Sequence, residues 1–220
     1  MRFLSLVLLI ILSACNAGQT FRPTTTIDPQ KALVIIGFRN IGGEEVNHPE
    51  FQFKFWPASV QNGRLEYGPG SVPLVIGNFL CRGGPFGTHA VETSDGVCFY
   101  AVAVDARPFV LYEMKGYASR GFFQGGAPIV QYFGLDDRGP AGRRRPENIL
   151  WLNLTPGEVR FVSVQNISSS AEVLRQRSLG QMAPITQAQV QELLRLLPQL
   201  AGRQIVKQGF DRESDLARRQ

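Results

Sequence analysis

The chain has 220 residues, of which 44% are hydrophobic and 19% are charged, and its formal net charge is +5. These values are typical of a folded protein with one domain or one domain plus appendages, and they exclude an intrinsically disordered chain. Fifteen phenylalanines and 23 glycines favour strands joined by tight turns over a helical bundle.

Residues 1–14 have the organisation of a signal peptide. Arg2 precedes an apolar run from Phe3 to Leu12, which is about half of the roughly 20 residues needed to span a bilayer. Small residues and a cysteine follow this run. We therefore expect residues 1–14 to be removed, which leaves 206 residues (220 − 14) in the mature chain.

The segment Leu12-Ser13-Ala14-Cys15 resembles the lipobox of bacterial lipoproteins. The resemblance implies that the Cys15 thiol receives a diacylglyceryl group, that a peptidase cuts before Cys15, and that the new amine receives an acyl chain such as palmitate. Two or more chains make detachment from a membrane negligible. Asn16 replaces the aspartate of inner-membrane lipoproteins, which indicates the outer membrane. The alternatives are a secreted protein with a chance cysteine and an uncleaved signal anchor.

The two remaining cysteines fit this compartment. Cys81 and Cys98 lie 17 positions apart (98 − 81), and the bacterial envelope outside the inner membrane is oxidising. We predict a Cys81–Cys98 disulfide, which would contribute roughly 3 kcal/mol by the chain-entropy argument. Two buried free thiols are the alternative.

Residues 15–30 are predicted to form a flexible lipidated tether because they are small and polar and include two prolines. Residues 31–168 are predicted to form the folded domain. Candidate strands recur there at roughly eight- to twelve-residue intervals, which is typical of a β-sandwich or barrel. They cover residues 32–39, 51–56, 64–67, 72–80, 97–104, 109–115, 117–124, 129–133, 149–154 and 158–164.

These strands predict a mainly β protein, an antiparallel β-sandwich with a C-terminal amphipathic helix. A parallel α/β sheet would need crossover helices, and the region has no helical pattern. Pro57 is expected to end the second strand. Thr155-Pro156-Gly157 is expected to close a hairpin between the last two strands.

Residues 169–202 are predicted to form a C-terminal helical extension. Glu172–Arg177 suits either a strand or a short helix. Thr186 and Gln189 have the spacing of a capping box, and the helix is expected over residues 186–200. Its apolar stripe consists of Val190, Leu193, Leu194 and Leu197. Residues 203–220 form a polar tail that we expect to be frayed.

Two segments carry a further resemblance. Pro108–Glu113 and Trp151–Val162 are similar to a pattern in uncharacterised bacterial envelope lipoproteins with transthyretin-like or immunoglobulin-like sandwiches, often with a C-terminal helix. The pattern covers about a quarter of the chain, and its motif is a turn. It therefore implies a fold and no activity.

No catalytic or metal-binding pattern is evident in the sequence. The mature chain has two histidines, His48 and His89, and it lacks a Gly-x-Ser-x-Gly elbow, paired metal-ligand spacings and a phosphate-binding loop. We expect no cofactor and no enzymatic activity. The enzymatic alternative would place His89 with Glu92 or Asp95 in a pocket near the Cys81–Cys98 loop.

The run Arg143-Arg144-Arg145 is the most distinctive charged feature. It could contact an anionic envelope component or an acidic protein partner, and the alternative is a solvated loop. Nucleic acid is not expected as a partner, because the compartment largely excludes it.

The expected function follows from these features. The protein is predicted to be a lipid-anchored lipoprotein of the bacterial envelope, held at the outer membrane and facing the periplasm. There it would act as a non-enzymatic interaction or structural module. The alternatives are an enzyme acting on an envelope glycan or lipid, and a carrier of a small apolar ligand.

Overall fold

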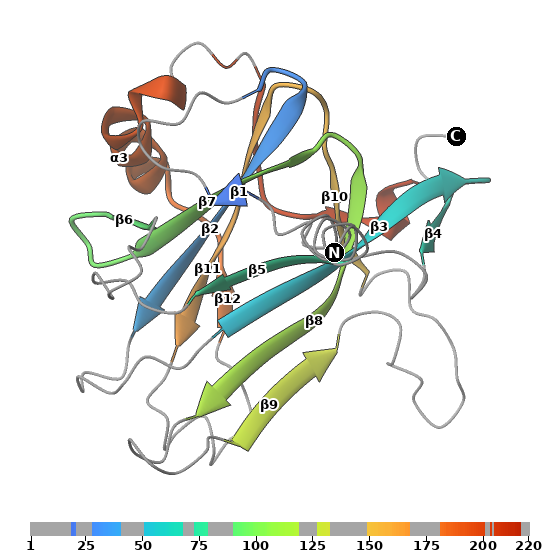
Figure 1. Ribbon diagram of the computed structural model, residues 1–220, viewed down its shortest axis with the longest axis horizontal. Helices are drawn as coiled ribbons and strands as arrows, with labels where there is room; N and C mark the ends of the chain where they lie inside the picture. Colours follow the sequence, from blue (N-terminus) through green and yellow to red (C-terminus); the bar gives the residue numbers. More distant parts are fainter. Residues whose placement is uncertain are drawn as a thin grey trace, which may run out of the picture.

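The structure is a computed structural model that describes residues 19–20, 28–40, 51–67, 73–78, 90–118, 127–132, 149–167, 181–200, 203 and 205–216. Within these residues the protein is mainly β, as predicted, with two seven-stranded sheets and a single α-helix (Figure 1).

The first sheet, called sheet A, has the strand order β1-β7-β2-β11-β12. Strand β6 also pairs with β7, and β13 also pairs with β11. The bounds are β1 Gln19–Thr20, β2 Lys31–Asn40, β6 Ala90–Glu92, β7 Cys98–Asp105, β11 Glu158–Ile167, β12 Gln181–Ala183 and β13 Ile205–Gln208.

The second sheet, called sheet B, has the strand order β14-β10-β8-β3-β4. Strand β5 also pairs with β3, and β9 also pairs with β8. The bounds are β3 Phe51–Gln61, β4 Arg64–Tyr67, β5 Leu74–Asn78, β8 Pro108–Ala118, β9 Ala127–Tyr132, β10 Leu150–Asn153 and β14 Asp211–Arg212.

Strand β11 corrects the prediction that all strands are antiparallel. It runs parallel to β2 on one side, with Val159 opposite Leu33, and parallel to β13 on the other. Parallel pairing requires a long crossover connection. Strands β3 to β10, most of which belong to sheet B, form that connection between β2 and β11, and the segment containing the α-helix forms it between β11 and β13. The lack of a helical pattern in the sequence between residues 31 and 166 therefore did not exclude parallel pairs.

The Pro-Gly turn does not close a hairpin, which corrects a second prediction. Strand β10 pairs with β8 and β14 in sheet B, whereas β11 lies in sheet A. The turn is tight, because Glu158 donates its backbone N–H to the Thr155 carbonyl at 3.1 Å and Gly157 has a φ of 74°. It therefore carries the chain from one sheet to the other.

Two predicted strand boundaries were also wrong. Pro57 does not end β3, which continues to Gln61. Pro57 lies between the β3 residues that pair with β5 and those that pair with β4, a place where a missing N–H is tolerated. Strand β8 continues to Ala118, so the separate strand expected over 117–124 begins inside β8.

One hydrophobic cluster takes side chains from both sheets. Alternate residues of β2 and β7 meet alternate residues of β3, β5 and β8, as expected where one face of each strand is buried. Its most deeply buried members are Ala32, Val34, Ile36, Phe53, Phe55, Leu111 and Leu152.

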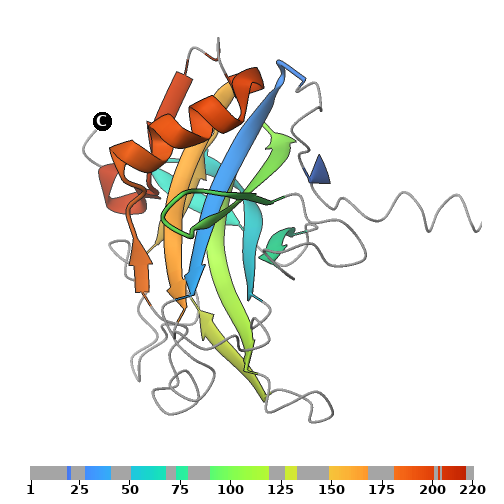
Figure 2. The ribbon, with the colours of Figure 1, turned by 90° about the vertical axis from the view of Figure 1, so that its left-hand side faces the viewer.

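The α-helix α3 (Gln187–Leu196) lies within the range expected from the sequence, and the short 3-10 helix η2 (Pro198–Leu200) follows it. Thr186 and Gln189 form the capping box, with the Gln189 N–H donating to Thr186 Oγ1 at 3.3 Å and the Thr186 N–H donating to Gln189 Oε1 at 2.9 Å. Figure 2 shows α3 across the face of β2 and β11 that is turned away from sheet B. There Val190, Leu193 and Leu197 join a second cluster with the opposite faces of the sheet A strands.

Both ends of the chain are more structured than the sequence suggested. Strand β1 lies inside the segment predicted to be a flexible tether and pairs with β7. Strands β13 and β14 and the 3-10 helix η3 (Glu213–Asp215) lie inside the tail predicted to be frayed. Two to four paired residues leave too short a pattern to identify a strand by alternation.

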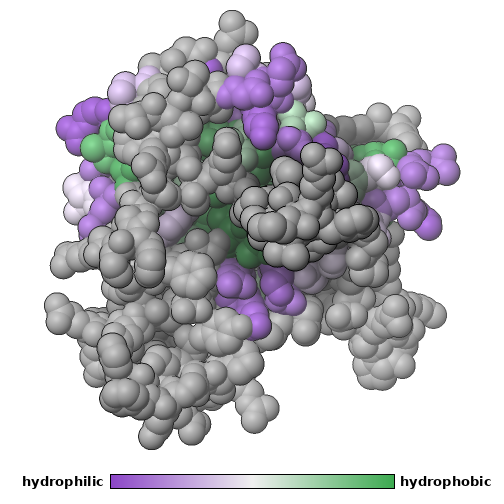
Figure 3. All heavy atoms as spheres, viewed as in Figure 1, coloured by the Kyte–Doolittle hydropathy of each residue, from purple (hydrophilic) through white to green (hydrophobic). Residues whose placement is uncertain are grey.

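The coloured surface in Figure 3 is mostly hydrophilic at its edge, and hydrophobic side chains lie deeper toward the middle of this face. Among the residues described by the structure, no helix has the length and apolar character needed to cross a membrane.

Helix α3 provides a direct test of the packing. Leu193 of α3 is fully buried, whereas Leu196 on the same helix is 38% exposed. We expect Leu193→Asp to lower the free energy of unfolding by several kcal/mol, because it buries an unpaired charge. Leu196→Asp is the matched control and should cost much less. Urea unfolding of both variants measures the difference, and equal losses would contradict the packing of α3 on sheet A.

Candidate functional site

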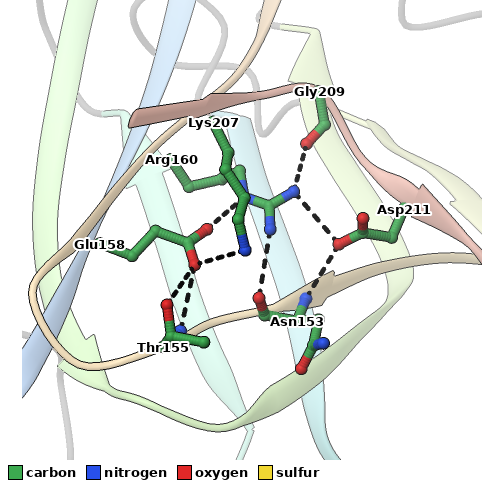
Figure 4. Close-up of polar contacts among 7 residues, drawn as sticks. All are labelled: Asn153, Thr155, Glu158, Arg160, Lys207, Gly209 and Asp211. Carbon is green, nitrogen blue, oxygen red and sulfur yellow. Dashed lines mark hydrogen bonds and ion pairs between the residues drawn. The ribbon is translucent and has the colours of Figure 1, made fainter. Parts of the chain in front are cut away.

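A group of charged side chains is buried between the ends of the two sheets. Figure 4 shows its members, which we call the inter-sheet polar network. Glu158 is 0% exposed and Arg160 is 2% exposed, which is unusual for charged residues. The network comprises Asn153 at the end of β10, Thr155 in the turn that follows, Glu158 and Arg160 on β11, Lys207 on β13, Gly209 between β13 and β14, and Asp211 on β14.

Arg160 uses its guanidinium group to contact three different segments. Its Nε donates to Glu158 Oε1 at 2.7 Å, and its Nη2 donates to the Asn153 carbonyl at 3.2 Å. Its Nη1 donates to Asp211 Oδ2 at 3.1 Å and to the Gly209 carbonyl at 3.2 Å. The guanidinium group therefore joins β11 of sheet A to β10 and β14 of sheet B.

The Glu158 carboxylate accepts four hydrogen bonds. Oε1 accepts the bond from Arg160, and Oε2 accepts bonds from the Thr155 N–H at 3.1 Å, Thr155 Oγ1 at 2.9 Å and Lys207 Nζ at 3.1 Å. A buried charge is tolerated only where it is paired and hydrogen-bonded, and Glu158 meets both conditions.

The pKa of the Glu158 carboxyl reflects two opposing effects. Burial is the largest single effect and raises the pKa, because it disfavours the charged form. The hydrogen bond and charge of Arg160, with hydrogen bonds from Lys207 and Thr155, together outweigh it and hold the pKa below its usual value. Glu158 is therefore an anion at neutral pH.

The strand period explains why these charges face inward. Glu158, Arg160 and Val162 lie on one face of β11, and Val162 belongs to the cluster shared by the two sheets. The intervening Val159 and Phe161 face α3. Sequence reasoning missed this site because charged residues alternating with apolar ones normally indicate a solvent face. The Pro-Gly turn before Glu158 is the only signal that could have located it.

A second polar cluster fastens α3 to the turn between β6 and β7. Asp95 Oδ1 accepts from Thr93 Oγ1 at 2.6 Å, Asp95 Oδ2 accepts from Gln189 Nε2 at 2.9 Å, and Asp95 also pairs with Arg39. Ser94 donates its N–H and its hydroxyl to the Glu192 carboxylate at 2.8 and 2.9 Å. Burial raises the pKa of Asp95. The hydrogen bonds from Thr93 and Gln189 and the charge of Arg39 together outweigh this effect, so the pKa of Asp95 lies below its usual value.

Several residues predicted from the sequence lie outside the described residues: Cys15, His48, Cys81, His89, Arg143, Arg144, Arg145 and the segment Glu172–Arg177. Cys98 is buried in the shared core and is disulfide-bonded. Its pairing with Cys81 stays a prediction.

The acidic residues of the enzymatic alternative are described. Glu92 is exposed on β6, and the Asp95 carboxylate is engaged with three side chains from β2, the β6–β7 turn and α3. Within the described part of the chain, no group of three or more His, Cys, Asp or Glu side chains is placed to hold a metal ion.

Comparisons of the chain with protein-family profiles, with curated proteins and with solved structures gave no match. The chemistry of the inter-sheet polar network is therefore argued from its geometry. Its carboxylate and guanidinium groups are turned toward each other and toward backbone groups of both sheets. The arrangement links the two sheets and fixes the point at which the C-terminal segment crosses from sheet A to sheet B.

The network yields a stability prediction. Arg160→Met should lower the free energy of unfolding by about 3–5 kcal/mol, because the buried Glu158 carboxylate and the partly exposed Asp211 carboxylate both lose the guanidinium group, and only Glu158 keeps a second cation, Lys207. Arg195→Met is the matched control. Arg195 is 78% exposed and its ion pair with Glu192 is long, at 3.9 Å, so the loss of this side chain should cost under about 0.5 kcal/mol. Chemical denaturation measures both. The double variant Glu158→Gln/Arg160→Met should lose less than Arg160→Met alone, and a larger loss would contradict the charge pairing.

The network also predicts how stability depends on pH. The folded-state pKa of Glu158 lies below the ordinary value of 4.5. Its carboxylate therefore contributes stability that is fully present above pH 4.5 and is lost as the pH falls through the folded-state pKa. We expect Glu158→Gln to be less stable at pH 7 and to lose less stability on acidification to pH 3. Glu92→Gln, an exposed glutamate on β6, should keep the wild-type slope in urea titrations across this range.

Proposed function

We propose that this protein is a lipid-anchored lipoprotein of the bacterial envelope, held at the outer membrane and facing the periplasm. It acts there as a non-enzymatic interaction or structural module. The observation that carries the proposal is the sequence Leu12-Ser13-Ala14-Cys15 after a short apolar run. A β-rich domain follows within a few residues, because β1 begins at Gln19.

The architecture that we propose for this module is a β-sandwich closed on one face by a C-terminal amphipathic helix. The cluster that takes side chains from both sheets supports the sandwich. The buried row Val190, Leu193 and Leu197 against sheet A supports the helix as a cover. The parallel strands around β11 make sheet A mixed.

The proposed role as an interaction or structural module is supported by the contacts of the ionisable groups in the two polar clusters. Glu158 and Arg160 join the sheets, and Asp95 joins a turn to α3. The pKa values of the Glu158 and Asp95 carboxyl groups are held below their usual range, and groups with perturbed pKa values often mark an active site. Here each one is matched to fixed donors that belong to the fold. A stable body positioned by a lipid suits a docking or structural role.

The anchor is tested by Cys15→Ser in a bacterial host that processes lipoproteins. The variant should lack lipid label and remain as an uncut precursor, because the thiol that would be acylated is gone. Asn16→Ala keeps the thiol and is the control, which should still be labelled and cut. Metabolic labelling with a palmitate analogue and mass spectrometry of the N-terminus measure both. Normal processing of Cys15→Ser would refute the anchor.

A further inference from the structure

Strand β1 connects the proposed lipid anchor directly to sheet A. Gln19 lies opposite Ala103 and Thr20 lies opposite Val102 at the edge of β7, and Figures 1 and 2 both show β1 beside that strand. Only four residue steps separate Cys15 from Gln19 (19 − 15). A chain of that length spans at most about 14 Å. A lipid on Cys15 therefore cannot be far from the edge of β7.

The direction of β1 shows which end of sheet A lies nearest to the proposed anchor. Because β1 and β7 are antiparallel, the chain enters β1 from the side of Asp105, the last residue of β7. Asp105 lies opposite Lys31 at the start of β2, and their charged groups are 3.9 Å apart. Arg203 donates to the Lys31 carbonyl at 3.4 Å. We call this group, with the exposed Arg107 after β7, the Lys31 end of sheet A.

The start of α3 is linked to the end of β2 that is far from Lys31. Gln189 contacts Asp95, which pairs with Arg39 near the end of β2. Eight residue steps separate Lys31 from Arg39 (39 − 31), which corresponds to roughly 26 Å. Side-chain contacts therefore connect the first turn of α3 to the Arg39 end of β2 and not to the Lys31 end.

We propose that β1 fixes the orientation of the domain on the membrane, with the Lys31 end against the lipid headgroups and the first turn of α3 directed away from them. The proposal rests on the proposed lipid anchor at Cys15 and goes beyond it. A flexible tether of residues 15–30 would let the domain rotate freely. Pairing of β1 with β7 shortens the link between the proposed lipid and the sheet to the residues before Gln19.

The chemistry of the Lys31 end suits a headgroup surface. Lys31, Arg107 and Arg203 provide three cationic groups beside the two carboxylates of Asp28 and Asp105. The Arg107 guanidinium lies 5.6 Å from the ring centroid of Phe109, and its side chain is exposed. Cations placed at a membrane surface are attracted to lipid phosphates. The partner of this end is therefore the phospholipid surface that holds the anchor.

The orientation can be measured on the full-length lipidated protein. A fluorophore is attached through Arg107→Cys at the Lys31 end or through Ala188→Cys on the exposed side of the first turn of α3. The protein is bound to vesicles of three parts phosphatidylethanolamine and one part phosphatidylglycerol that contain a headgroup-spin-labelled lipid. We expect quenching to be stronger at Arg107→Cys than at Ala188→Cys.

The role of β1 is tested in the same vesicles. Gln19→Pro/Thr20→Pro removes both backbone donors of β1 and should abolish the difference between the two labels, while the protein still sediments with the vesicles. Gln19→Ala/Thr20→Ala keeps both N–H groups and should preserve the difference.

Three other outcomes would contradict the orientation, the role of β1 or the proposed anchor. Equal quenching at both positions in bound, lipidated protein would refute the orientation and leave the anchor intact. An unchanged difference in the proline variant would refute the role of β1. Protein that carries no lipid by mass spectrometry and does not sediment with vesicles would refute the proposed anchor, and the orientation with it.

Discussion

The buried guanidinium group of Arg160 is the contact on which the arrangement of the two sheets depends. It donates to a carboxylate on its own strand and to backbone and side-chain oxygens of segments from sheet B. A cation inside a protein is stable only where its hydrogen bonds are made. This requirement fixes three things together: the end of β10, the crossing at Gly209 and the start of β14. Apolar contacts alone would allow more slippage between the sheets, because they are not directional.

The C-terminal segment completes the fold that Arg160 organises. Strand β13 pairs with sheet A, and two residues later β14 pairs with sheet B. Gly209 makes the crossing with a φ of 76°, and its N–H donates to the Phe161 carbonyl at 2.8 Å. Phe210 then stacks on Phe55 of β3, with ring centroids 6.4 Å apart. Beyond the crossing, Glu213 accepts the Leu65 N–H at 2.8 Å. One short stretch therefore closes one end of the core and contacts both sheets.

The sequence was sufficient for the β class and for most of the long strands, because each long segment repeats its pattern several times. It was insufficient for features set by tertiary contacts. Glu158 and Arg160 look like solvent-facing residues until β10, β13 and β14 cover them. Thr155-Pro156-Gly157 has the composition of a hairpin turn, and the assignment of its flanking strands to different sheets depends on distant partners. Strand β1 is two residues long and has no pattern of its own. The predicted sites at Cys15, Cys81 and Arg143–Arg145 lie outside the described residues.

The central place of β11 in sheet A constrains the order in which the protein can fold. Val159 lies opposite Leu33, which precedes it by 126 positions (159 − 33), and β13 follows later still. Contacts between residues so far apart form slowly, because a long loop must close first. During synthesis from the N-terminus, β2 and β7 are available well before β11 emerges. Sheet A is completed only after nearly the whole polypeptide is available, so one side of β2 stays unpaired until late in folding.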